Sequence, residues 1–96
     1  MKRRTLLIAL VALIAAAGIG LARLARSASV GAGYVAKEVC SCMFVGGRSL
    51  ESCRGDVPES MDRVQAEALQ DGVRGFVPVL AERVARYEPG FGCTLH

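Results

Sequence analysis

Residues 33–53 read GYVAKEVCSCMFVGGRSLESC and hold three of the four cysteines of the chain. On a helix, where successive residues are about 100° apart, one broad face of this stretch is apolar. The residues of that face are Val35, Ala36, Val39, Cys40, Cys42, Met43 and Phe44. Lys37, Glu38 and Ser41 fall on the opposite face. The pattern predicts an amphipathic helix of about three turns that ends at Gly46-Gly47, with Ser49 capping a short helix after it.

The N-terminal quarter of the chain has the pattern of a membrane segment. Three basic residues at positions 2–4 precede Thr5–Ala22, a run of 18 residues without charge, and Arg23 and Arg26 follow. In a helix this run spans about 27 Å, enough for the hydrocarbon core of a bilayer. The basic start predicts a cytoplasmic N-terminus and an extracytoplasmic remainder, anchored in the inner membrane. The alternative for residues 1–26 is a signal peptide, cut near residues 25–29, which would release a periplasmic or secreted protein.

The remaining chain is predicted to form a linker and one small domain. Residues 27–33, SASVGAG, are small and are expected to form a flexible linker to a folded domain over residues 34–96. Two alternatives stay open for residues 58–79. Asp56–Glu59 has the pattern of a capping box that opens a helix through Gln70. Asp71-Gly72, between alternating apolar residues, instead predicts a β-hairpin.

The four cysteines predict two disulfides. An even number of cysteines in a small exported domain is typical of disulfide bonding, and four allow three pairings. A core this small supplies about 3–5 kcal/mol on its own, so such cross-links are needed. On a helix Cys40 and Cys42 project about 200° apart, so they are not expected to bond each other or to share a metal ion. Free thiols with a redox role are a further alternative.

Charge and motifs argue against several classes of function. The net charge of +3 comes from residues 2–4, because nine basic residues balance nine acidic ones from residue 5 onward. Without a basic patch, nucleic-acid binding is not expected. The sequence has no Ser-x-x-Lys, no Gly-x-Ser-x-Gly and no phosphate-binding loop. We therefore expect no catalytic residue, no cofactor and no metal site.

Two segments resemble a known family. They are Gly33-Tyr34-x-Ala36-Lys37-x-x-Cys40-Ser41-x-x-Phe44-Val45-x-Gly47-Arg48 and Tyr87-x-x-Gly90-x-Gly92-Cys93-Thr94-Leu95. Together they resemble the N-terminal, pre-catalytic segment of exported serine hydrolases of the β-lactamase-like class, which include 6-aminohexanoate-oligomer amidases. In that family a domain with Ser-x-x-Lys follows, and His96 ends this chain before that domain is expected to begin. No catalytic residue can therefore be assigned from the resemblance.

The resemblance also bears on the cysteines and on the sheet. It implies that Cys40 pairs with Cys93, which leaves Cys42 and Cys53 as the second pair. It favours strands over a helix for residues 64–87. The chain is then an α+β protein with an N-terminal membrane or signal helix, a cysteine-bearing helix, a small antiparallel sheet and two disulfides.

Three functions remain open. The first is a non-enzymatic accessory or interaction domain of the bacterial envelope, with the membrane and an envelope protein as partners. The second is a truncated or split N-terminal part of a serine hydrolase, completed by a separate catalytic chain. The third is an extracytoplasmic thiol redox protein.

Overall fold

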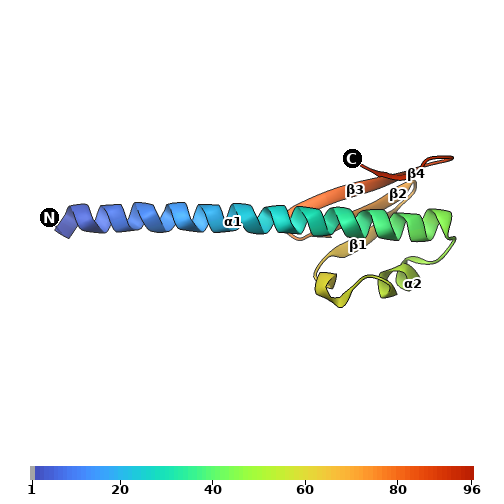
Figure 1. Cartoon of the computed structure of the whole chain (residues 1–96), viewed down its shortest axis with the longest axis horizontal. Helices are drawn as coiled ribbons and strands as arrows, with labels where there is room; N and C mark the ends of the chain where they lie inside the picture. Colours follow the sequence, from blue (N-terminus) through green and yellow to red (C-terminus); the bar gives the residue numbers. More distant parts are fainter. Residues whose placement is uncertain (1) are drawn as a thin grey trace.

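The computed structural model describes residues 2–96 and consists of one long helix with a small sheet on its second half (Figure 1). Helix α1 spans Lys2–Cys40 and continues directly into a π-helical turn, η1, at Ser41–Val45. The other elements are α2 Leu50–Gly55, the 3₁₀ turn η2 Glu59–Met61, β1 Gln65–Leu69, β2 Gly72–Val77, β3 Ala81–Glu88 and β4 Gly92–Leu95. The molecule is 67 Å long. This is the α+β fold that the sequence predicted.

The four strands form an antiparallel sheet in the order β1-β2-β3-β4. Gly75 of β2 lies opposite Ala66 of β1 and Arg83 of β3, and Cys93 of β4 lies opposite Tyr87. The hairpin alternative is therefore correct, and a helix through Gln70 is wrong. The physical reason is the alternation along β1 and β2, which buries apolar side chains such as Val73 on one face while charged ones point to solvent.

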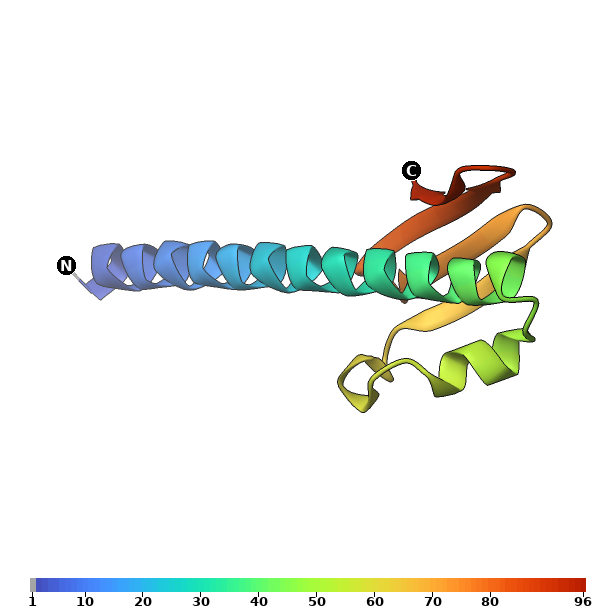
Figure 2. The ribbon, with the colours of Figure 1, turned by 45° about the vertical axis from the view of Figure 1, so that its right-hand side comes forward.

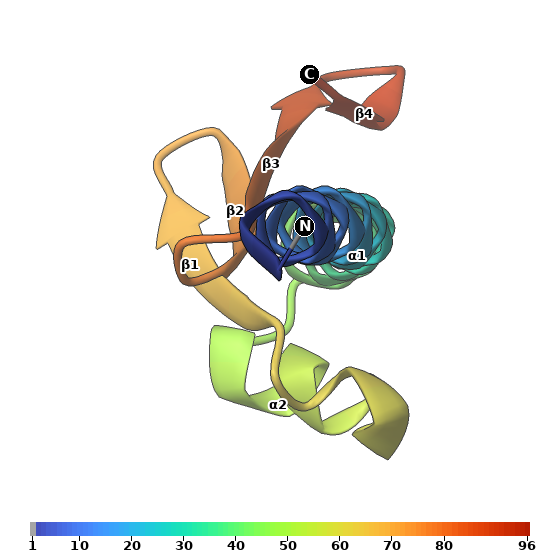
Figure 3. The same cartoon turned by 90° about the vertical axis from the view of Figure 1, so that its left-hand side faces the viewer.

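The core lies between the C-terminal half of α1 and the sheet. The buried residues of α1 are Gly31, Ala32, Gly33, Val35, Ala36, Val39 and Cys40. They pack with Val64, Val73, Ala85 and Cys93. At the edge of this core the rings of Phe44 and Tyr87 stack, with their centroids 5.5 Å apart. Figure 3, a view along the helix, shows the strands curving around one side of α1. The apolar face predicted for residues 35–44 is correct, and it begins earlier, at Gly31.

The predicted flexible linker over residues 27–33 is wrong, because these residues are helical and Gly31–Gly33 are buried. Their small size serves close packing. A Cβ atom placed on Gly75 of β2 would lie 2.3 Å from the Ala32 carbonyl oxygen, so the strand backbone approaches the helix backbone directly. The apolar segment and the core helix are consequently one continuous rod (Figure 2).

The first half of α1 is bare. Residues 2–24 are exposed, and an 18-residue window of the Lys2–Val45 helix has a mean hydropathy of 2.6 with none of it buried. This is the one helix among residues 2–96 that is long and apolar enough to cross a membrane. Nothing in the sheet covers it, as Figure 1 shows.

Two disulfides connect the rest of the chain to the continuous α1–η1 helix. Cys40 bonds Cys93 of β4, the pair that the resemblance implied, and Cys42 bonds Cys53 of α2, the predicted second pair. Cys40 and Cys42 therefore face different elements, as the helical periodicity predicted. The helix ends where the two glycines stand, with Gly47 at a φ of +69°. The Ser49 hydroxyl accepts a hydrogen bond from the Ser52 N–H at 3.2 Å, which confirms the predicted cap.

Candidate binding groove beside the Cys42–Cys53 disulfide

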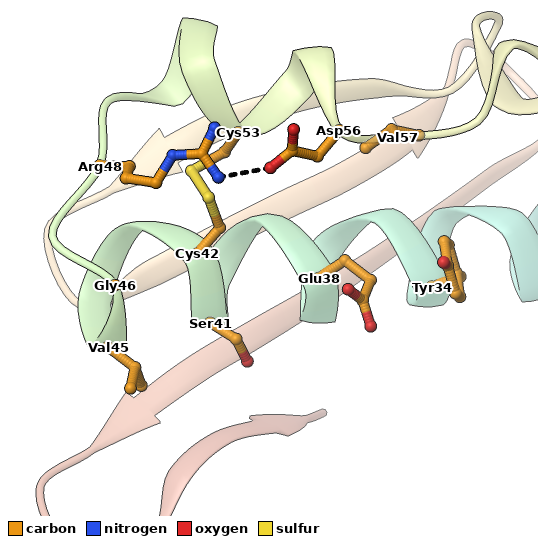
Figure 4. Close-up of a pocket in the computed structure, with 10 residues that line it drawn as sticks. All are labelled: Tyr34, Glu38, Ser41, Cys42, Val45, Gly46, Arg48, Cys53, Asp56 and Val57. Carbon is orange, nitrogen blue, oxygen red and sulfur yellow. Dashed lines mark hydrogen bonds and ion pairs between the residues drawn. A yellow bond between two sulfur atoms is a disulfide. The ribbon is translucent and has the colours of Figure 1, made fainter.

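A groove of about 470 Å³ runs between the end of the α1–η1 helix and the segment that carries α2 (Figure 4). Its lining residues are Tyr34, Glu38, Ser41, Cys42, Val45, Gly46, Arg48, Cys53, Asp56 and Val57. The groove lies on the outside of the domain, and the core side of α1 faces the sheet instead. It joins an apolar floor to a few polar groups, the usual composition of a binding site.

Arg48 fixes the wall of the groove that α2 forms. Its Nε and one Nη donate to the Ser52 hydroxyl at 3.0 and 2.7 Å, and its other Nη pairs with the Asp56 carboxylate. Arg48 precedes the N-cap of α2 and Asp56 is its C-cap, so one side chain links both ends of this short helix. Both partners are about half exposed, and such a pair contributes at most about 1 kcal/mol. Its role is to shape the wall.

The floor depends on the disulfide and on a glycine. Cys53 is buried and Cys42 is half-buried, so their bond closes the groove from below. In the π-helical turn the Gly46 N–H donates to the Ser41 carbonyl oxygen at 3.0 Å. A Cβ atom on Gly46 would lie 2.6 Å from the Cys42 carbonyl oxygen. Only glycine therefore lets the helix end close over the disulfide.

The opposite wall presents three polar side chains of α1 and η1. Tyr34, Glu38 and Ser41 are spaced four and three residues apart, so they follow one stripe of the helix (Figure 4). The Tyr34 side chain is exposed, and Glu38 forms no ion pair with any residue between 2 and 96. Because the Arg48 charge is already paired with Asp56, Glu38 leaves this groove with a net negative charge. It is suited to an apolar ligand or peptide that carries a cation.

Within the described chain, the lining of the groove offers the Ser41 hydroxyl no histidine or lysine that could act as a base. The one histidine, His96, lies 3.4 Å from the Thr94 hydroxyl beyond β4. Among residues 2–96 no group of three or more His, Cys, Asp or Glu side chains is arranged to hold a metal ion. The expectation that the chain has no catalytic residue, cofactor or metal stays a prediction.

The solvent face of the sheet carries a self-paired charge network. Arg74 binds Glu67 at 3.1 Å and Glu82 at 2.9 Å, and its guanidinium lies 4.0 Å from the centre of the Phe76 ring. The hydrogen bond with Arg74 lowers the pKa of Glu82, and the same bond raises the pKa of Arg74. Arg74, Glu67 and Glu82 are paired with one another, so none of these three charges is left unpaired for a ligand.

The structure brings the four predicted cysteines together as two pairs and leaves none free. The groove itself was not predicted from the sequence. One feature of the sequence points to its α2 wall. Polar residues stand four positions apart at Arg48, Ser52 and Asp56, a helical spacing that lets their side chains meet. Comparison of the chain with protein-family models, with curated proteins and with solved structures found no match.

Proposed function

We propose that this chain is a membrane-anchored, non-enzymatic domain of the bacterial envelope, of the accessory or interaction type. The observation that carries the proposal is the continuity of α1: its first half is apolar and bare, and its second half is the core of the folded unit. An apolar helix of this length is stable in contact with lipid and costly to leave in water. A single element would then serve as both anchor and scaffold.

The charges and disulfides support one orientation. The basic residues at positions 2–4 favour a cytoplasmic N-terminus. Two disulfides persist in an oxidising compartment, which supports a location of residues 27–96 outside the cytoplasm. An uncut anchor also fits the helix better than a signal peptide does, because a cut near residues 25–29 would fall within α1, just before Gly31 packs on the sheet.

The groove supplies the interaction site of this proposal. Its free carboxylate, Glu38, and its exposed ring, Tyr34, stand on a rigid helix beside an apolar floor. A second envelope protein with a basic and apolar segment is the partner that this chemistry fits. The disulfide keeps the two walls at a fixed separation and the Arg48–Asp56 pair shapes the α2 wall, which lowers the entropy cost of binding.

Reporter fusions test the topology. Alkaline phosphatase fused after His96 is expected to be active in bacterial cells, because it folds only where its own disulfides form, outside the cytoplasm. β-Galactosidase fused at the same position is the matched control and is expected to be inactive. The unfused chain should remain at full mass in carbonate-washed membranes. Cytoplasmic activity would contradict both the anchor and the signal peptide, and a shortened soluble chain would contradict the anchor alone.

A second candidate is the N-terminal part of a serine hydrolase, as the resemblance implies. One observation favours it: the two segments that carry the resemblance lie together. A Cβ atom on Gly33 would lie 3.3 Å from Leu95, and Cys40 is bonded to Cys93. A catalytic domain would then be supplied by a separate chain.

Hydrolysis assays separate the two candidates. The purified chain alone is expected not to turn over amide, ester or β-lactam substrates, since it has no Ser-x-x-Lys. Addition of a chain with Ser-x-x-Lys, encoded next to this one, should leave its activity unchanged if the first proposal holds. Activation of that chain would favour the second candidate. Turnover by the purified protein alone, abolished by a serine-directed inhibitor, would contradict both.

A further inference from the structure

The turn between β2 and β3 is apolar at its tip. Residues 76–81 read FVPVLA, six residues without charge or side-chain hydrogen-bonding group. Pro78 is exposed, and Val79 is fully exposed. The β1–β2 turn differs. It holds Gln70 and Asp71, and Asp71 pairs with Arg86 at 2.6 Å.

The backbone of this tip holds Val79 in an unfavourable conformation. The Leu80 N–H donates to the Val77 carbonyl oxygen at 3.1 Å, which closes a tight turn with Val79 at a φ of +71°. Turns of this kind take glycine or asparagine at that position, because a β-branched side chain is strained there. Val79 is the one non-glycine residue with positive φ among residues 2–96. An apolar side chain held outward at a conformational cost indicates a contact that compensates for it.

The tip lies at the end of the sheet that faces the bare half of α1 (Figures 1 and 3). A Cβ atom on Gly33 would lie 3.8 Å from the Arg83 side chain, so these two residues lie at the same height along the axis of α1. Strand β3 begins at Ala81, two residues before Arg83, and the Val77–Leu80 turn projects beyond it, so the tip lies at most about 13 Å from Arg83 along the strand. Because a helix rises 1.5 Å per residue, the tip is level with about residues 24–27 of α1. That is the first turn beyond the uncharged run that ends at Ala22.

We infer that the Val77–Leu80 tip inserts into the headgroup layer of the bilayer, beside the anchor helix. The inference rests on the proposed anchoring of α1 through residues 5–22. The headgroup layer adds about 5–7 Å on each side of the hydrocarbon core, which is the depth at which the tip lies. Pro78 and Val79 would meet lipid there, while Arg23 and Arg26 meet phosphate groups. With α1 and the tip as two points of attachment, the whole molecule cannot rotate freely about the axis of α1 in the bilayer.

Tryptophan fluorescence tests this inference cleanly, because the chain contains no tryptophan. Val79→Trp is introduced into the full chain, which is reconstituted in phosphatidylcholine–phosphatidylglycerol vesicles whose lipids are brominated near the headgroup end of the acyl chain. Its emission is expected to shift to the blue and to lose most of its intensity relative to vesicles without bromine. Pro78→Trp, at an exposed position without positive φ, is a second probe in case Val79→Trp does not fold.

Two further single-tryptophan variants make the outcomes decisive. Phe91→Trp is the matched control, since Phe91 is as apolar and well exposed but lies in the β3–β4 turn at the opposite end of the sheet. It should keep its intensity. Leu21→Trp, close to the headgroup end of the proposed span, reports the anchor and should be quenched. Quenching at position 21 without quenching at 78 or 79 would overturn the inference and leave the anchor intact. Absence of quenching at all of these positions would overturn both the anchor and the insertion of the tip. A blue shift at 78 or 79 without quenching would mean that the tip is buried against protein, which also overturns the inference.

Discussion

Paired Cys40→Ala and Cys93→Ala substitutions are expected to unfold the sheet of this protein. The disulfide closes a loop with a sequence separation of 53, for which the chain-entropy model gives about 4 kcal/mol. A core of this size supplies about 3–5 kcal/mol, so the loss removes most of the stability. The position of the bond adds to the effect. Strand β4 has only β3 as a neighbour in the sheet, and the bond joins it covalently to α1.

Amide hydrogen exchange of the full chain in detergent micelles measures this result, because α1 remains helical in the micelle and would dominate a spectroscopic signal. Amides of β2 and β3 should lose most of their protection. The matched control is the pair Cys42→Ala and Cys53→Ala, whose loop is shorter, with a separation of 11, and is worth about 3 kcal/mol in the same model. That bond fastens α2 at the periphery, so exchange should rise in residues 48–57 while the sheet stays protected. Equal protection of the sheet in both variants would contradict the assigned role of Cys40–Cys93.

Two disulfides could be predicted from the number of cysteines, whereas the strands were favoured over a helix only by the resemblance. The helical spacing of Cys40 and Cys42 required separate partners, and the resemblance was needed to choose Cys93 for the first of them. For residues 58–79 the local pattern allowed a helix or a hairpin. The choice depends on α1, since the alternation places Val64 and Val73 against that helix and leaves the charged residues outside.

The prediction of a flexible linker over residues 27–33 is wrong because composition alone does not distinguish a linker from a closely packed helix face. The stretch SASVGAG has the composition of a flexible linker, and the same composition suits a helix face that a strand backbone must approach closely. The residue that makes this stretch a packed helix face and not a linker is Gly75, because its lack of a side chain leaves room for the Ala32 carbonyl. Gly75 lies 42 residues beyond Gly33, so the local sequence does not reveal this contact. The groove escaped prediction for a similar reason, because its walls come from two helices whose relative position is set by the Cys42–Cys53 bond.

Gly75→Ala should separate the sheet from α1. The added Cβ atom would lie 2.3 Å from the Ala32 carbonyl oxygen and 3.1 Å from the Ala36 Cβ and N atoms. These neighbours are backbone atoms of α1 and the Cβ atom of an alanine. None of them can move by rotation of a side chain, so the clash persists. Overpacking of a core costs about 1–3 kcal/mol, and we expect a value near the upper end, about 3 kcal/mol. That loss approaches the whole contribution of the small core.

Gly55→Ala is the matched control for this substitution. Gly55 has no atom within 4 Å of an added Cβ and has no positive φ, so alanine there should be neutral or stabilise α2 by up to about 1 kcal/mol. Urea titration with hydrogen exchange of β2 and β3 as the readout compares the two variants in the same micelles. If Gly75→Ala were as stable as Gly55→Ala, β2 could not approach residues 31–36 as closely as it does here. Residues 27–33 would then have no packing reason to be small, and a flexible hinge between the anchor and the domain would again explain their composition. A marked loss of stability confined to Gly75→Ala would instead establish that these small residues hold the domain rigidly on α1.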